Sequence, residues 1–187
     1  MQYRFNTQIL RPLDLVFTVD YMFHPWQITK NISTAGWKNA LNRKIPGHVT
    51  TIVKRKSILK LAEMVEPIGK FTDIAHYMHS EWYKPKIIAV KRFTVYSDNN
   101  TMLLANDRAI KFIESVVEYG LREAIAKFGF NINYDIKSQY YCSEFSRWVT
   151  EKDIKWKDEH YVKISPIDMM SYTNSYFVWT AWSGYHV

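Results

Sequence analysis

Cysteine is almost absent from this chain of 187 residues, which contains one, Cys142. A single thiol excludes an internal disulfide and any zinc site built from several thiolates, so the fold requires no oxidising compartment. Nor does any proline-, glycine- or serine-rich linker or internal repeat divide the chain. Its hydrophobic content of 47%, with 16% aromatic residues, is enough to fill a sizeable core. We therefore expect one globular domain spanning residues 1–187.

Long apolar runs are also missing. No window approaches the roughly 18 uninterrupted apolar residues that a membrane span requires. The first residues, "MQYRFNTQILRPLDLVF", lack the basic start and continuous apolar stretch of a secretory signal. The sequence thus predicts a soluble protein of a reducing compartment, the cytoplasm being the simplest, while export by a non-standard route or association with a virion stays open.

Positive charge is in excess, with 25 Lys and Arg against 18 Asp and Glu and a formal net charge of +7. Such a charge favours an anionic partner, whether nucleic acid, phospholipid head groups or an acidic cell-wall polymer. The basic residues lie in small groups, as at 43–44 and 54–56, rather than in one long run. We therefore expect no nucleic-acid partner, and an ordinary solvated basic surface is the simpler interpretation. Peripheral contact with a membrane stays open.

Hydrophobic periodicity predicts both strands and helices, as in an α+β fold. Helices are predicted over 71–82, where Thr72 or Asp73 could act as a cap, over 106–127 behind an Asn-Asp cap, and from about Cys142 onwards. Residues 20–46 are irregular and predict loops with a short helix. The predicted strands are 13–19, 48–53, 57–65, 86–96 and the aromatic C-terminal stretch 175–187.

The first turn of a helix is a special position for Cys142. Unpaired backbone N–H groups and the helix dipole stabilise negative charge there, which favours the thiolate and suits a nucleophile. Free cysteine is also among the most commonly buried residue types, and a lone cysteine is usually inert packing. Both interpretations stay open on this position alone.

A thiolate nucleophile needs a base, and His48 has a carboxylate within reach. If Arg55 and Lys56 form the two-residue loop of the hairpin, Lys54 faces Ser57 and His48 faces Glu63, with Cβ atoms roughly 4.5 to 5.5 Å apart. At that distance a carboxylate can hold an imidazole in one tautomer. A one-residue slip would move Glu63 to the other face. A four-residue loop of the same register is equally compatible, because the turn lacks Asn-Gly.

The remaining histidines predict no site. His76 and His79 lie three residues apart on the predicted helix 71–82 and could share a metal, but no third ligand is apparent in the sequence. We therefore predict no metal and no cofactor.

Several motifs together resemble a known family. The run "GHVTTIVKRKSILKLAEMVEP" (47–67), followed far downstream by "YYCSEF" (140–145), resembles the YiiX-like permuted papain-fold hydrolases, a circularly permuted branch of the NlpC-type cysteine peptidase superfamily. The resemblance extends to "LRPLDLVF" (10–17), to "NYDIKSQYYCSEF" (133–145) and to "ISPIDMMSY" (164–172), in the order of the family. One departure is Leu13, which stands where the family usually has glycine before the aspartate, here Asp14.

The resemblance implies an α+β permuted papain-like (NlpC-type) fold, in which a small antiparallel sheet or half-barrel packs against helices and the nucleophile lies at a helix N-terminus. It implies hydrolysis of an amide bond through a thioester, with Cys142 as nucleophile, His48 as general base and Glu63 orienting the histidine. Tyr134, Gln139 and Tyr141 are candidates for oxyanion or substrate contacts. The expected substrate is a peptide, a cell-wall peptide or a lipid-derived molecule. A lipid ester or amide hydrolase or acyltransferase of the related branch, and a non-catalytic binding protein on the same fold, stay open.

Overall fold

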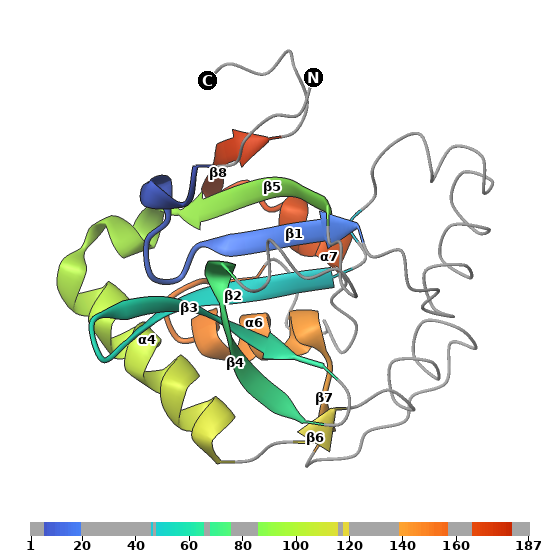
Figure 1. Cartoon of the computed structure of the whole chain (residues 1–187). Coiled ribbons are helices and arrows are strands. Elements are labelled where there is room, and N and C mark those ends of the chain that lie inside the picture. Colours follow the sequence, from blue (N-terminus) through green and yellow to red (C-terminus); the bar gives the residue numbers. More distant parts are fainter. Residues whose placement is uncertain are drawn as a thin grey trace.

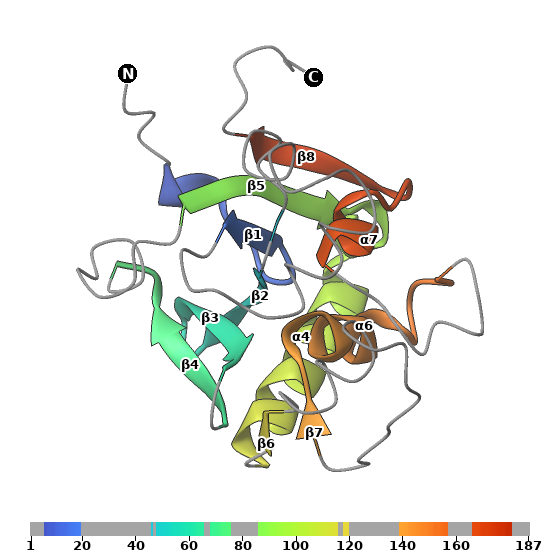
Figure 2. The same ribbon diagram turned by 90° about the vertical axis from the view of Figure 1, so that its right-hand side faces the viewer.

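The structure is a computed structural model, and it describes residues 6–19, 46, 48–65, 68–75, 86–115, 118–119, 139–156 and 166–180. These residues form a six-stranded open sheet in the order β4-β3-β2-β1-β5-β8, with every neighbouring pair antiparallel. Figure 2 shows α4, α6 and α7 together on one side of the curved sheet. The described part of the chain is therefore an α+β fold, as predicted.

The elements have the following bounds. The sheet consists of β1 (Leu15–Val19), β2 (His48–Arg55), β3 (Ile58–Met64), β4 (Gly69–Asp73), β5 (Lys86–Phe93) and β8 (Ser175–Thr180). The helices are α4 (Asn99–Glu114), α6 (Cys142–Thr150) and α7 (Pro166–Met170), with 3-10 turns η1 (Thr7–Ile9) and η2 (Thr94–Ser97). Two short strands, β6 (Glu118–Tyr119) and β7 (Gln139–Tyr140), pair in parallel.

Alternating side chains of the strands divide between two apolar clusters, one on each face of the sheet. On β2, Val49 and Val53 join the larger cluster, which includes the buried residues of α4 and α6. Ile52, between them, joins a smaller cluster with Val16 of β1 and Leu61 of β3. Because successive side chains of a strand point to opposite faces, this division fixes the face of every residue of β2.

The hairpin between β2 and β3 differs from its predicted register by two residues. Lys54 pairs with Leu59 and Arg55 with Ile58, so the loop is Lys56-Ser57 and the predicted pairing of Lys54 with Ser57 is wrong. Both loop residues have positive φ, 48° and 67°, as a type I′ turn requires. The sequence hides this turn because neither residue is Gly or Asn. A shift of two leaves every side chain on its predicted face.

The predicted helix over 106–127 begins earlier. α4 starts at Asn99, capped by the Asp98 carboxylate, which accepts a hydrogen bond from the Thr101 N–H at 2.8 Å. The helix ends at Glu114, and residues 118–119 lie in β6. The predicted Asn-Asp cap at 106–107 is thus wrong, because Asn106 lies buried in mid-helix. The part of the prediction over 120–127 lies outside the described residues.

The other predicted elements are confirmed in part. Of the predicted helix 71–82, residues 71–73 belong to β4, because they pair with β3, whereas 74–75 are helical and 76–82 lie outside the described residues. The strand predicted over 86–96 ends at Phe93, where η2 follows. The C-terminal strand is present as β8, with 181–187 outside the described residues. The prediction for 20–46 falls almost wholly outside them.

Leu13, just before β1, has a backbone conformation that favours glycine. Its φ is 68°, the left-handed region, which costs a non-glycine residue about 1 to 2 kcal/mol. Its N–H donates to the Ile52 carbonyl at 2.7 Å, and its side chain is buried in the larger cluster. The turn therefore forms with leucine, whose burial offsets the backbone cost.

Candidate active site

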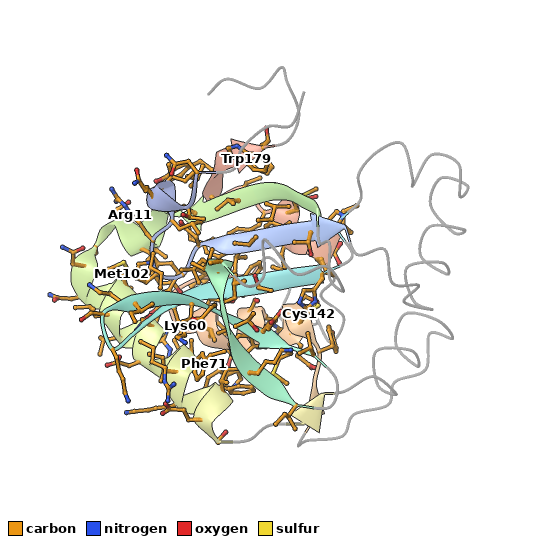
Figure 3. The ribbon with its side chains drawn as sticks, viewed as in Figure 1. Arg11, Lys60, Phe71, Met102, Cys142 and Trp179 are labelled. Carbon is orange, nitrogen blue, oxygen red and sulfur yellow. The ribbon has the colours of Figure 1, made fainter. Side chains whose placement is uncertain are left out.

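Cys142 is the first residue of α6, as the sequence predicts. The helix is amphipathic and buries Phe145 and Val149 against the sheet. Its second turn is held on β2 by a hydrogen bond of 3.0 Å between the hydroxyls of Ser146 and Thr51. Ser146 also donates to the carbonyl of Cys142 at 3.2 Å. The free thiol is 1% exposed, and Figure 3 shows Cys142 at the α6 ribbon.

His48 and Glu63 form a buried contact. His48, the first residue of β2, is 4% exposed, and Glu63 on β3 is 2% exposed. The distance from His48 Nε2 to Glu63 Oε2 is 3.7 Å, which is an ion-pair distance rather than a hydrogen bond. Thr72 of β4 donates a hydrogen bond to the other carboxylate oxygen, Oε1. The corrected register therefore still brings His48 and Glu63 together, as a diagonal pair instead of a directly opposed one.

The start of β2 and the start of α6 lie at the same end of the sheet. In Figure 1, β1 points to the right-hand side of the molecule, so its antiparallel neighbour β2 begins there, and α6 begins there as well. Cys142 and His48 thus approach the same end of β2 from two elements.

The side chains of β2 alternate between the two faces of the sheet, so His48 and Thr51 point to different faces. Thr51 faces α6, so His48, three residues earlier, begins on the opposite face, together with Ile52. Among the residues that the structure describes, no hydrogen bond joins Cys142 to His48. The structure therefore brings His48 to Glu63 but does not bring the imidazole into hydrogen-bond contact with the thiol.

The three predicted oxyanion or substrate contacts have different outcomes. Tyr141 is the N-cap residue of α6, with extended backbone angles, and its side chain is buried. Gln139 lies in β7, three residues before Cys142, where the helix begins. Tyr134 lies outside the described residues. The backbone of 139–141 therefore leads directly into the first turn of α6.

Sequence reasoning missed two buried interactions, the ion pair of Asp14 with Arg92 and the hydrogen bonds of the Lys91 amine. The Arg92 guanidinium holds both carboxylate oxygens of Asp14 at 2.8 Å, while burial raises the pKa of Asp14 above 3.8 against the opposing effect of Arg92. Lys91 donates from Nζ to the carbonyls of Met170 and Tyr172 at 2.7 and 2.8 Å, at the end of α7. Burial lowers the pKa of Lys91 from 10.5 to about 8. Both anchor the fold and lie in positions that local patterns do not reveal.

In the described ranges, no three His, Cys, Asp or Glu side chains come together as a group that could hold a metal ion. His76 and His79 fall outside these ranges. Of the helices that can be described, none is both long enough and apolar enough to cross a membrane.

The fold and the site together define an α+β protein whose antiparallel sheet carries a buried histidine-glutamate pair beside a helix that begins with cysteine. No protein-family model and no curated protein matches the chain. Among solved structures, the chain is similar to the crystal structure of the metalloprotein yiiX from Escherichia coli O157:H7 (DUF1105), with 16% identity and a TM-score of 0.48. The match covers 76% of this chain and 65% of that one, so this chain spans slightly less than two thirds of its length.

Proposed function

We propose that the protein is a cysteine-dependent hydrolase of the permuted papain-like type that cleaves an amide bond of a peptide or cell-wall peptide. Cys142 is the nucleophile, His48 the general acid and base, and Glu63 the carboxylate that orients His48. The buried contact between His48 and Glu63, on the strand against which the cysteine-bearing helix packs, is the observation that carries this proposal.

A buried carboxylate is costly unless other groups pair with it. Glu63 has a contact at each oxygen, the Thr72 hydroxyl at Oε1 and the imidazole at Oε2. A carboxylate in this position favours the protonated imidazole and restrains the ring. A histidine with these properties suits proton transfer to and from a neighbouring thiol.

The reaction proceeds in two halves. The Cys142 thiolate attacks the carbonyl carbon of the substrate and forms a C–S bond. The C–N bond then breaks as the His48 imidazolium donates its proton to the departing amine. Water attacks the resulting thioester while neutral His48 accepts a proton from it. The C–S bond breaks, releasing the carboxylic acid and restoring the thiolate and imidazolium. The backbone N–H of Cys142, at the positive end of the α6 dipole, stabilises the oxyanion in both halves.

Two features of the geometry set conditions on this mechanism. Thr51 faces α6 and His48 points to the other face of the sheet. The imidazole must therefore reach the thiol past the end of β2, where His48 lies. Burial disfavours a thiolate, whereas a helix N-terminus favours it. The reactivity of Cys142 measures the balance of these effects.

The test is acylation of the full-length protein by p-nitrophenyl acetate, an activated ester that probes the acyl-enzyme step without knowledge of the natural substrate. We expect a burst of nitrophenolate, an acetyl group on Cys142 by peptide mass analysis, and loss of both in Cys142→Ala. His48→Gln should slow acylation by about tenfold or more. Alkylation by iodoacetamide at pH 6 should be faster than that of a free thiol whose pKa is about 8.5. A native protein with no burst and no enhanced alkylation would overturn the proposal.

A further inference from the structure

Thr72 connects a third strand to the pair formed by His48 and Glu63. The sequence offers this residue as a helix cap, but the structure places it on β4, the edge strand, where it pairs with Leu61. Glu63 lies two residues further along β3, so the two side chains are diagonal neighbours on one face of the sheet. The Thr72 hydroxyl donates to Glu63 Oε1, and Oε2 faces His48 Nε2.

A carboxylate at the far end of a strand can rotate about its side-chain torsions, so that contact with one partner does not fix it. A donor on Oε1 defines which oxygen is left for the imidazole. Thr72 is the donor that the described residues supply to that oxygen. β4 therefore helps to orient the pair formed by His48 of β2 and Glu63 of β3.

Other charged groups lie near the face of the sheet that carries Glu63 and could influence the protonation of His48. Lys70 on β4 pairs directly with Glu63 across the strands and is exposed. Lys60 forms its ion pair of 2.8 Å with Asp73, and both alternate to the other face. The ion pair of Asp14 and Arg92 lies at the start of β1. Of these groups, Lys70 is the one that the strand register sets against Glu63.

We infer that Thr72 is a positioning residue, which orients the Glu63 carboxylate so that Glu63 in turn orients His48. The inference deepens the proposed function, on which its catalytic consequence rests. The relation of Thr72 to the histidine can be measured separately, because it does not require Cys142 to react.

The experiment follows the titration of the His48 imidazole C–H by NMR in the full-length protein. In Thr72→Val, which has nearly the same shape but no hydroxyl, we expect the midpoint to fall by about half a pH unit or more. Thr72→Ser, which keeps the donor, should return it to within about 0.2 units of the wild type. Acylation by p-nitrophenyl acetate should slow about threefold or more in Thr72→Val and recover in Thr72→Ser.

The matched control is Thr101→Val. It removes a hydrogen bond of the same kind, from the Thr101 hydroxyl to the Asp98 carboxylate at 2.7 Å, at the start of α4. We expect it to lower stability without moving the His48 midpoint. Thermal unfolding of each variant shows that the chain is folded at the temperature of measurement.

Two results would overturn the inference. The first is an unchanged His48 midpoint in Thr72→Val when Glu63→Gln moves it, and the second is a shift in Thr72→Ser as large as that in Thr72→Val. A wild-type protein that is not acylated at all would overturn the proposed function instead, and the NMR midpoints would still decide whether Thr72 acts on His48 through Glu63.

Discussion

Asn106, in the middle of α4, hydrogen-bonds both backbone groups of Lys54 on β2. Its Oδ1 accepts from the Lys54 N–H at 2.7 Å, and its Nδ2 donates to the Lys54 carbonyl at 3.1 Å. On this side of β2, β1 and the residues before it bond to the backbone as far as Ile52, and at Lys54 the amide of Asn106 takes the place of a neighbouring strand. One side chain thereby completes the sheet and fixes the helix on it.

We expect Asn106→Ala to lower the free energy of unfolding by about 2 to 4 kcal/mol, since it leaves two backbone groups without their partner. Asn106→Asp, which keeps one acceptor but replaces the donor, should also be destabilising. Urea denaturation followed by circular dichroism measures both. The control is Asn100→Ala, at an exposed position of the same helix, for which a loss below about 0.5 kcal/mol is expected. Equal effects at the two positions would contradict the role of Asn106.

Glu63→Gln should slow acylation of Cys142 by p-nitrophenyl acetate by about tenfold or more, because an amide cannot favour the imidazolium as a carboxylate does. Glu114→Gln is the matched control. It neutralises a half-exposed carboxylate that pairs with Arg55 at 2.9 Å, away from the site. We expect its acylation rate to equal that of the wild type. If both variants react alike, Glu63 has no part in the reaction.

Arg92→Met should destabilise the protein by about 3 to 5 kcal/mol at pH 7, because it leaves the fully buried Asp14 carboxylate without its cation. The pKa of Asp14 is raised in the folded protein by burial, so between 3.8 and that value the folded state binds more protons than the unfolded chain. Stability from this group therefore falls as the pH rises through that window.

Without Arg92 the window extends to higher pH, since the guanidinium is the main group opposing the effect of burial. The deficit of Arg92→Met relative to the wild type should accordingly shrink as the pH is lowered from 7 towards 4. Urea titrations of both proteins at several pH values test this. A deficit that is constant with pH would mean that the variant loses packing alone.

Lys91 predicts a pH dependence at the alkaline end. Its pKa is about 8 in the folded protein and about 10.5 in the unfolded chain, so between these values the unfolded chain binds more protons. The contribution of Lys91 to stability therefore rises as the pH goes from 8 towards 10. Lys91→Met cannot titrate, and the difference in unfolding free energy between wild type and variant should move in favour of the wild type over that range. A difference that does not change with pH would contradict the lowered pKa.

Gly69→Ala should be destabilising by about 1 to 3 kcal/mol, the usual cost of overpacking. A Cβ at this buried position, where β4 begins, would lie 2.7 Å from Met64 Sδ and 2.9 Å from Ile113 Cδ1. The stability lost through Gly69→Ala should be smaller in a Met64→Ala background than in a Met64→Leu background, because the smaller side chain makes room for the added Cβ. Each double variant is compared with its own Met64 single variant. Thermal unfolding compares them, and a neutral Gly69→Ala would show that the contact relaxes without cost.

Local patterns identified several elements correctly. The strands that begin at His48 and Ser175 and the helix that begins at Cys142 follow from short-range alternation and from the helical spacing of Phe145 and Val149. The contact of His48 with Glu63 can be predicted because both residues lie in one hairpin. A register error of two residues leaves each side chain on its predicted face of the sheet.

The errors have physical causes. Asparagine favours helix starts, so the sequence predicts Asn106 as a cap, yet its amide bonds to a strand 52 residues away in the chain. The Lys56-Ser57 turn was missed because residues other than glycine and asparagine rarely adopt positive φ. The local spacing around Thr72 predicts a helix, because that spacing carries no information on its pairing with Leu61 of β3.

The sequence by itself determined that His48 opens a strand, that this strand forms a hairpin with the strand carrying Glu63, and that Cys142 opens a helix. Only the tertiary structure decided the hairpin register, the diagonal contact of His48 with Glu63, the Thr72 hydroxyl on that carboxylate, and the buried ion pair of Asp14 with Arg92. The reason is that periodicity is a local property, whereas the partners of buried polar groups are supplied by whichever distant strands and helices pack against them.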